Sequence, residues 1–352
     1  MYTRNQTQKI KVGNIEIGGN NKVIIQSMCN IKTSKTDEVI KQINDLIIRG
    51  CEIIRVSVID DDDALSIKEI KKRITIPLVA DIHFDYKLAI KAIENGVDKI
   101  RINPGTLGNK KQIEEIINLC KLHDIPIRIG INGASLEKDI EEKWGSNNAI
   151  SMIESLKRSI AFFESKNFKN IIISVKSSNV LETIKAYTMA SELFSYPLHI
   201  GITEAGDLSS SLVRSSAGLG ILLNEKIGNT IRISITGNPI FEIDACKELL
   251  STFNLYNSFP KLISCPTCGR TNYDMLPIIE KVKAYLNTIN NNISVAIMGC
   301  IVNGPGEAKN ADIGLAGGNK EAVIFKKGKI LKKVKEKDAA DELINEIKNM
   351  IL

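Results

Sequence analysis

Eight short runs rich in isoleucine, valine and leucine recur along the first 235 residues, and segments with helical periodicity lie between them. Near-continuous apolar runs of this length are typical of parallel strands that are buried on both faces. Most strand starts lie about 20 to 33 residues apart, which is the length of one strand–helix unit. The predicted strands are Val23–Met28, Ile53–Val58, Leu78–Ile82, Lys99–Ile102, Ile127–Ile131, Ile171–Val175, Leu198–Thr203 and Ile231–Ile235.

Eight such units in roughly 250 residues predict an α/β protein built on a closed (β/α)8 TIM barrel. A doubly wound open sheet is the alternative, but the units are regular and carry no glycine fingerprint. An extra segment, Gly133–Trp144, lengthens the gap between the fifth and sixth strands. The expected helices are Asp37–Ile48, Ala64–Ile70, Tyr86–Asn95, Lys111–Leu122, Ile150–Phe163, Leu181–Phe194 and Phe241–Leu250.

A boundary follows the last of these helices, at Asn257–Pro260. We therefore predict a barrel domain over residues 1–258 and a second domain over residues 259–352. The second domain alternates short strands with two helices, which predicts a small α+β fold. Its helices are expected at Leu276–Asn287 and Ala339–Ile351, and its strands at the residues before Cys265 and at Ile293–Met298, Ile313–Leu315, Ala322–Phe325 and Lys329–Leu331.

Basic side chains recur in the predicted barrel strands, whose interiors normally exclude them. Four of the eight strands contain an arginine (Arg55, Arg101, Arg128 and Arg232), and Lys176 directly follows another strand. Because a barrel gathers the carboxyl ends of its strands at one mouth, we expect these five cations to converge. Arginine binds phosphate in a bidentate manner, so the sequence predicts a dense site for anions, most simply phosphates. Separate structural ion pairs are the alternative.

Further polar residues fall at the same ends of the predicted strands. His83 can donate to a phosphate, and Glu204, the only glutamate at the predicted rim, is a candidate for proton transfer. The segment Gly206–Ser211 offers backbone donors for a phosphate at a helix N-terminus, although a flexible loop and a close-packed helix explain it at least as well. Asn103, Asn132, Thr203 and Ser234 complete this group of polar residues.

Three cysteines of the second domain lie in loops rich in glycine and proline. Cys265 and Cys268 form a Cys-x-x-Cys turn, and Cys300 lies seven residues before Glu307. Three thiolates and a carboxylate would complete a tetrahedral site, and thiolates select zinc, Cu(I) or iron–sulfur clusters. A redox dithiol fits less well because the turn does not open a helix, whereas spacing alone does not decide between zinc and a cluster.

Composition narrows the choice of partners. The net charge is +6, from 47 basic and 41 acidic residues, and aromatic residues make up 5% of the chain. We interpret the pairs Lys326–Lys327 and Lys332–Lys333 as a solvated face, and we expect no nucleic-acid surface. No apolar run reaches the length of a membrane span and the N-terminus has no leader-like segment, so no membrane partner is expected. Seven scattered cysteines suit a reducing compartment, which predicts a cytoplasmic protein.

Several segments together resemble one enzyme family along essentially the whole chain. They are Gln26–Met28, Ala80–Phe84, Ile100–Gly105, Arg128–Asn132, Gly201–Gly206, Ile231–Ser234, Ser264–Arg270 and Met298–Ala308. The family is 4-hydroxy-3-methylbut-2-enyl diphosphate synthase, the iron–sulfur oxidoreductase of the methylerythritol phosphate route in isoprenoid biosynthesis. Two positions depart from the pattern: Asn229 stands where aspartate is expected, and Cys29 stands where threonine is frequent.

The resemblance implies a barrel joined to a small [4Fe–4S] domain of the sulfite/nitrite-reductase kind, in a head-to-tail homodimer. It implies that Cys265, Cys268, Cys300 and Glu307 are the cluster ligands. The implied substrate is 2-C-methyl-D-erythritol 2,4-cyclodiphosphate, which two electrons from flavodoxin or ferredoxin convert to 4-hydroxy-3-methylbut-2-enyl diphosphate with loss of one water.

The resemblance also implies roles for the polar residues. Glu204 would handle the proton of the leaving hydroxyl group. Glu307 would be catalytic as well as a ligand, because a carboxylate leaves a metal more readily than a thiolate does. The residues expected to bind substrate are Arg55, His83, Arg101, Asn103, Arg128, Asn132, Lys176, Thr203, Arg232, Ser234 and Asn303.

Two other functions compete with this interpretation. A phosphate-binding barrel of the pteroate-synthase kind, with a zinc-stabilised appendage, would explain the arginines and the thiols, and it predicts a colourless protein. A non-enzymatic iron–sulfur carrier or sensor would explain the thiols, but it has no need of five converging cations.

Overall fold

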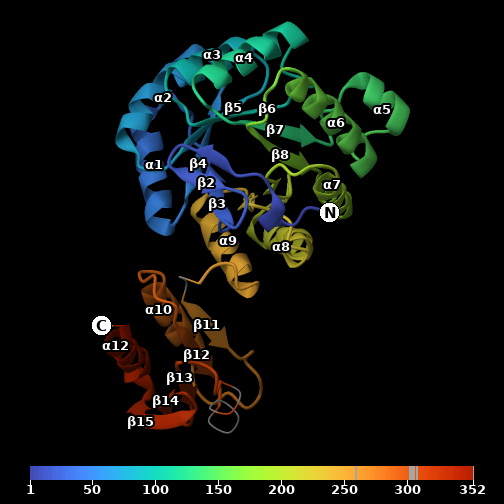
Figure 1. Cartoon of the computed structure of the whole chain (residues 1–352). Helices are drawn as coiled ribbons and strands as arrows, with labels where there is room; N and C mark the ends of the chain where they lie inside the picture. The colour runs from blue at the N-terminus through green and yellow to red at the C-terminus, as the bar shows by residue number, and fades with distance from the viewer. Residues whose placement is uncertain (258–259, 301–305, 307, 352) are drawn as a thin grey trace. The chain divides into compact units, whose positions relative to one another are not determined.

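A computed structural model describes the chain from residue 1 to residue 351, except residues 258–259, 301–305 and 307 (Figure 1). The chain divides into two compact units, Met1–Leu255 and Tyr256–Leu352, which we call the barrel unit and the C-terminal unit. The predicted domain boundary, after residue 258, lies three residues further along the chain.

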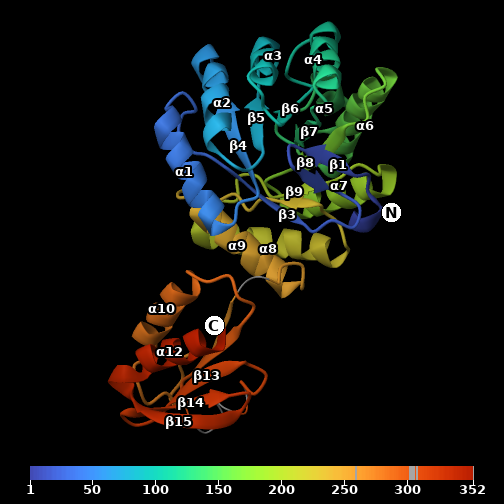
Figure 2. The same ribbon diagram turned by 60° about the vertical axis from the view of Figure 1, so that its left-hand side comes forward.

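The barrel unit contains eight parallel strands in the order β8-β7-β6-β5-β4-β3-β10-β9 (Figures 1 and 2). The strands are β3 (Ile24–Met28), β4 (Ile53–Val58), β5 (Leu78–Ile82), β6 (Lys99–Ile102), β7 (Ile127–Asn132), β8 (Ile171–Lys176), β9 (His199–Ile200) and β10 (Thr230–Ile231). A parallel bridge between Ile173 and Leu198 joins the two ends of this order. The predicted (β/α)8 barrel is therefore confirmed.

Helices surround the barrel (Figure 2), and all seven predicted barrel helices are present, whereas the helix Leu208–Asn224 was not among the predicted helices. They are α1 (Thr36–Arg49), α2 (Asp61–Arg73), α3 (Tyr86–Glu94), α4 (Lys110–Leu122), α6 (Ala149–Ser165), α7 (Val180–Leu193), α8 (Leu208–Asn224) and α9 (Ile240–Thr252), and the extra segment forms α5 (Lys138–Trp144). Side-chain caps fix several helix starts, because an Asn or Asp oxygen accepts a backbone N–H of the first turn. These caps are Asp60, Asp85, Asn109, Asn148, Asn179 and Asp207.

The seventh and eighth strands are shorter than the sequence suggested. The strands β9 and β10 have only two residues each, so the run Leu198–Thr203 contributes His199 and Ile200, and the run Ile231–Ile235 contributes Ile231 alone. Beyond them the backbone finds other partners: Ile235 N donates to Glu242 Oε1 at 3.2 Å, and Thr236 N donates to Gly206 O at 3.0 Å. Apolar runs report burial, and here burial continues after strand pairing has ended.

The N-terminal segment closes the bottom of the barrel. A hairpin of β1 (Ile10–Val12) and β2 (Ile15–Ile17) packs its apolar side chains against the N-terminal ends of β3, β4, β5 and β8. Asn229 fastens this segment, because its Nδ2 donates to Arg4 O and to Thr7 Oγ1, each at 3.0 Å. Its Oδ1 accepts from Leu198 N at 3.0 Å. An aspartate carboxylate at this position would accept the third bond but could not donate the first two.

The C-terminal unit is a five-stranded sheet in the order β11-β12-β13-β14-β15, with two helices on one face. Its elements are β11 (Lys261–Ser264), α10 (Met275–Leu286), β12 (Ser294–Met298), β13 (Ile313–Gly317), β14 (Glu321–Lys326), β15 (Lys329–Lys335) and α12 (Ala339–Ile351). The first three strands are parallel and the last two pair antiparallel. Ala296, Val323 and Phe325 line the other face together with the partly buried Cys265.

Among the described helices of both units, none combines the length and the apolar character needed to cross a membrane.

We predict that Asn229→Ala lowers the free energy of unfolding of the barrel unit by about 2 to 3 kcal/mol, because the substitution strands buried backbone groups that Asn229 now satisfies. Urea unfolding measures this loss. Asn5→Ala in the same N-terminal segment is the control, since Asn5 is exposed. Equal stability of the two variants would show that the Asn229 contacts do not hold the N-terminal segment.

Candidate active site

A pocket of about 260 Å³ opens at the carboxyl ends of the barrel strands. It contains five cationic side chains and one carboxylate. Its lining residues are Met28, Arg55, Asp81, His83, Arg101, Arg128, Asn132, Ser174, Lys176, Thr203, Arg232 and Ser234. The structure thus brings nine of the eleven expected substrate-binding residues to one place, and their binding role remains a prediction.

Arg128 is the most deeply buried cation of the pocket, with 2% of its surface exposed. Its Nε and one terminal nitrogen, Nη1, have no hydrogen-bond partner among the described residues. Burial, followed by repulsion from Arg55 and Arg101, holds the pKa of Arg128 well below its usual range. A buried guanidinium with unsatisfied N–H groups needs an acceptor, and an anion in the pocket would supply one.

The pKa values of Lys176 and Arg55 are also lowered, mainly by burial. Burial and the neighbouring arginines hold the pKa of Lys176 well below that of a free lysine. Burial lowers the pKa of Arg55 to about 10, although Asp81 opposes that shift. An anion bound here would therefore favour the protonated form of both side chains.

Asp81 is the carboxylate inside the pocket, and it was not among the predicted site residues. Its Oδ1 accepts from Arg101 Nη1 at 3.1 Å, and its Oδ2 lies 3.5 Å from both Arg55 Nε and His83 Nε2. Burial opposes its ionisation, but Arg55, His83 and Arg101 hold the pKa of Asp81 well below its usual range. Asp81 is thus a fixed anion that orients two arginines and the histidine.

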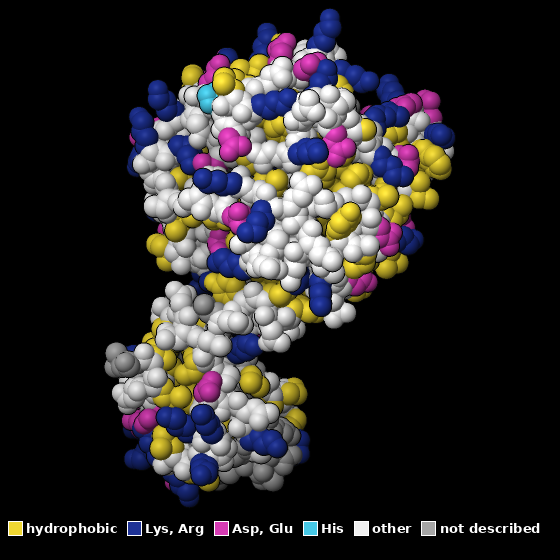
Figure 3. All heavy atoms as spheres, viewed as in Figure 1, with side chains coloured by type: hydrophobic (Ala, Val, Ile, Leu, Met, Phe, Trp, Pro, Cys, Tyr) yellow, Lys and Arg dark blue, Asp and Glu magenta, His cyan; other side chains and the backbone are white. Residues whose placement is uncertain are grey.

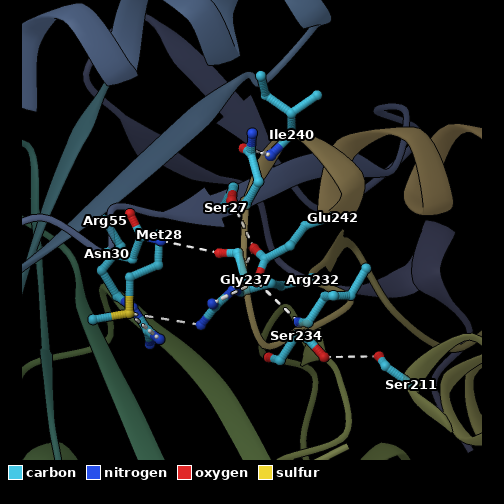
Figure 4. A network of polar contacts seen from close by, with 12 residues as sticks. Ser27, Met28, Asn30, Arg55, Ser211, Arg232, Ser234, Gly237, Ile240 and Glu242 are labelled. Atoms are coloured by element: carbon cyan, nitrogen blue, oxygen red, sulfur yellow. Dashed lines mark hydrogen bonds and ion pairs between the residues drawn. The ribbon is translucent and has the colours of Figure 1, made fainter. Parts of the chain in front are cut away.

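Glu242 orients the fourth arginine from behind the pocket (Figure 4). It lies in the first turn of α9 and is 1% exposed. Its carboxylate accepts from Arg232 Nε at 2.9 Å and from Arg232 Nη2 at 2.8 Å, and from Ser27 Oγ at 2.6 Å. Sequence reasoning missed Glu242 because it treated the residue as part of the helical pattern Phe241–Leu250. A glutamate just after the last barrel strand was the available signal.

Met28 lies between two of the arginines (Figure 4). Its sulfur accepts from Arg55 Nε at 3.1 Å and Nη2 at 2.9 Å, and lies 3.6 Å from Arg232 Nη1. A thioether is a weak acceptor, so it holds the guanidinium groups in place without neutralising them.

Three predicted residues lie elsewhere or in a different role. Asn103 is buried outside the pocket lining, where its Nδ2 donates to Ser135 O at 3.0 Å. Glu204 is exposed, has a left-handed backbone (φ 53°) and does not line the pocket. Arg101 lines the pocket, but its Nη2 also donates to Gly130 O at 3.2 Å, so Arg101 is partly committed to the barrel wall. Asn303 lies outside the described residues.

The Gly206–Ser211 segment contributes the start of α8. Asp207 caps this helix, and its carboxylate accepts from Ser210 N at 2.9 Å. A carboxylate occupies the position where a phosphate would bind the helix N-terminus, so the close-packed helix is the better description of this segment.

The three cysteine thiols of the C-terminal unit follow adjacent parallel strands, β11 and β12. The Cys265 sulfur accepts from Gly299 N at 3.1 Å, and a Cβ at Gly299 would lie 3.4 Å from that sulfur and 2.6 Å from Thr271 Oγ1. Cys268 is exposed, and hydrogen bonds from Arg270 lower its pKa. A sulfur that accepts a backbone N–H and a thiol with a lowered pKa suit thiolate ligands of a metal or cluster.

Cys300 is partly buried, and Glu307 lies outside the described residues. Within the described residues, no three His, Cys, Asp or Glu side chains are grouped closely enough to hold a single metal ion.

The remaining cysteines are buried in the barrel unit. They include Cys29, the residue that stands where threonine is frequent. Burial raises the pKa of Cys29, and burial raises the pKa of Cys51 to about 12. These thiols stay protonated, which fits packing rather than reactivity.

Comparison with known families decides the identity. A model described as the GcpE TIM-barrel domain matches residues 7–247, and one described as the GcpE protein C-terminal domain matches residues 261–349. The chain belongs to the GcpE family.

Curated relatives in this family match along their whole length and are named 4-hydroxy-3-methylbut-2-en-1-yl diphosphate synthase (flavodoxin). The relative from Caldanaerobacter subterraneus subsp. tengcongensis is 51% identical over 99% of this chain and 98% of its own. The relative from Clostridium perfringens is 49% identical over 99% of both chains, and the one from Malacoplasma penetrans is 48% identical over 99% and 95%. The resemblance predicted from the sequence is confirmed.

Solved structures add the fold alone. A dihydropteroate synthase from Stenotrophomonas maltophilia has a TM-score of 0.53 at 11% identity, and it covers 70% of this chain and 98% of its own. The barrel fold of this chain is thus also found in dihydropteroate synthase. The relatives that match along the full chain are named as a different enzyme, 4-hydroxy-3-methylbut-2-en-1-yl diphosphate synthase (flavodoxin).

We predict that sulfate binds the pocket with uptake of protons. Sulfate is a suitable probe because its own charge does not change between neutral and alkaline pH. In the free protein the pKa of Lys176 is depressed, so a bound anion must raise it and sulfate affinity must fall as the pH rises toward 10.5. Calorimetry in two buffers of different ionisation enthalpy measures the uptake. Lys176→Met should abolish most of it, and an unchanged proton uptake in that variant would refute the assignment.

We also predict that Glu242→Gln destabilises the barrel unit by about 3 kcal/mol, because it breaks the ion pair of a buried carboxylate with the partly buried Arg232. Asp244→Asn on the same helix is the matched control. Asp244 also forms a two-bond pair with an arginine, Arg49, but the Asp244 and Arg49 side chains are 31% and 21% exposed. The control should therefore lose about 1 kcal/mol or less, and equal losses in urea unfolding would contradict the prediction.

Proposed function

We propose that the chain catalyses the reductive ring opening of 2-C-methyl-D-erythritol 2,4-cyclodiphosphate to 4-hydroxy-3-methylbut-2-enyl diphosphate. Two electrons break one ring C–O bond, a hydroxyl group leaves as water, and the product gains a carbon–carbon double bond. The observation that carries the proposal is a pocket of five cations on a chain whose full-length relatives bear the name of this synthase.

The pocket residues suit a cyclic diphosphate. Arg55, Arg128 and Arg232 would bind phosphate oxygens through paired N–H groups, and Lys176 would add a point charge. Asp81 and Glu242 hold the guanidinium groups in position before substrate arrives. Fixed cations also stabilise the negative charge that develops on the phosphate oxygen as the ring bond breaks.

A [4Fe–4S] cluster is the cofactor we propose, with Cys265, Cys268, Cys300 and Glu307 as its ligands. When bound, the cluster supplies the electrons for the reduction. Gly299 leaves room beside the Cys265 sulfur, which supports this ligand set because any larger residue would meet Thr271.

The remaining roles follow the family resemblance. We propose Glu204 for proton transfer to the leaving hydroxyl group, with His83, Asn132, Thr203, Ser234 and Asn303 as further substrate contacts. Flavodoxin is the proposed donor, since the relatives' names include it, and ferredoxin is the alternative. A head-to-tail homodimer completes the proposal. The pteroate-synthase-like alternative is not favoured, because those proteins share only the barrel fold with this chain.

The test is anaerobic reconstitution with iron and sulfide, followed by turnover of the cyclodiphosphate with a small-molecule reductant. We expect a brown protein with about four irons per chain and release of the linear diphosphate. Cys265→Ser should lose most of the iron, whereas Cys120→Ser should retain it, because Cys120 is buried in α4 of the barrel unit. A protein that stays colourless and binds zinc instead would overturn the proposal.

A further inference from the structure

Lysines are concentrated along the β14–β15 hairpin. Residues 320–337 contain eight lysines and two glutamates. The lysines are Lys320, Lys326, Lys327, Lys329, Lys332, Lys333, Lys335 and Lys337. Within the described part of the chain, only Lys332 among them forms an ion pair, with Glu342 and Glu346 of α12. Basic side chains accordingly gather on the surface of the C-terminal unit (Figure 3).

Sheet register places one half of these lysines near the cysteine loops. β15 runs parallel to β12, because β14 is antiparallel to both of its neighbours. One row across the sheet reads Met298, Ala316, Val323 and Lys333. The end of β15 therefore lies at the sheet end from which the Cys265 and Cys300 loops emerge, about 14 Å from β12 at the usual strand spacing.

A groove of about 620 Å³ lies at this same end of the sheet. Its lining includes three lysines, Lys320, Lys335 and Lys337, and two glutamates. Glu336 is engaged, since its Oε1 accepts from Asp274 N at 3.0 Å. Lys320 has a left-handed backbone (φ 58°) in the turn before β14, a position that usually selects Gly or Asn.

We infer that this basic groove, lined by Lys320, Lys335 and Lys337, docks an acidic protein that delivers electrons. The inference rests on the proposed function, and it adds the surface and the charge of the partner. A standard interface covers about 800 Å² per partner, a disc of roughly 16 Å radius, so a donor centred on the groove would reach the cysteine loops. Opposite charges would speed the encounter and fix its orientation.

The competing explanation is that the lysines only protect the exposed edge of β15 from strand pairing. If that explanation holds, the lysines at the two ends of the hairpin have the same function, and neither end is more important for binding a donor. Docking requires the groove end alone, because the other end, with Lys326, Lys327 and Lys329, lies about 20 Å away along β15. At 0.1 M salt this separation is about two Debye lengths, so the two ends are electrostatically distinct.

The experiment compares two triple variants with the same charge change. Lys320→Glu, Lys335→Glu and Lys337→Glu reverse the groove, whereas Lys326→Glu, Lys327→Glu and Lys329→Glu reverse the opposite end. All six lysines are exposed, and each set contains one left-handed lysine, Lys320 or Lys327. The binding of a purified bacterial flavodoxin is measured by calorimetry at 0.1 M salt, and thermal unfolding checks that both variants are folded.

We expect the groove variant to weaken flavodoxin binding by about tenfold or more, and the control variant by less than about threefold. Turnover driven by photoreduced deazaflavin, an uncharged small molecule, should be unchanged in both variants. Equal weakening by the two variants, or no weakening by either, would overturn the docking surface. Absence of turnover by the reconstituted wild-type chain with the small reductant would instead refute the proposed function.

Discussion

The crowding of five cations into one barrel mouth is the constraint on which the rest of the site depends. Barrel interiors are normally filled by branched apolar side chains, and burial makes each unpaired cation costly. The protein places two buried carboxylates, Asp81 and Glu242, against the arginines. It leaves Arg128 and Lys176 without a carboxylate in contact among the described residues. The pocket is thus partly neutralised, which keeps the arginines oriented while preserving a net attraction for anions.

Much of this architecture could be read from the sequence, because apolar runs and helical periodicity report burial directly. Strands β4, β5 and β6 begin and end where the runs do. The predicted runs extend past the ends of β9 and β10, because residues at the mouth stay buried after strand pairing stops. Ile235, for example, is buried, but its N–H donates to Glu242. Burial and pairing are different physical quantities, and the sequence reports only the first.

The location of the site could also be predicted from the sequence, but the contacts within it could not. Position along a strand brought Arg55, Arg128 and Arg232 to one mouth, but it does not reveal which partner a polar side chain chooses. Asn103 turns to Ser135 instead of the pocket, and Glu242 reaches Arg232 from a helix. Helical periodicity treats Glu242 as one more position in a turn, so its role became visible only with side chains in place.

The contacts of Asn229 also join the start of the barrel unit to its last strand. Asn229 directly precedes β10, the last strand of the barrel, and its side chain bonds to Arg4, which lies 225 residues earlier in the sequence. Such a contact cannot form until nearly the whole barrel has been synthesised, and closing so long a loop is slow. The apolar side chains of the N-terminal hairpin can pack earlier, because β3, β4 and β5 follow the hairpin closely in sequence, but the hydrogen bonds to Asn229 form only when the barrel is nearly complete. Intermediates that precede that step hold the N-terminal segment through apolar contacts alone, and incompletely packed intermediates of this kind are prone to aggregation.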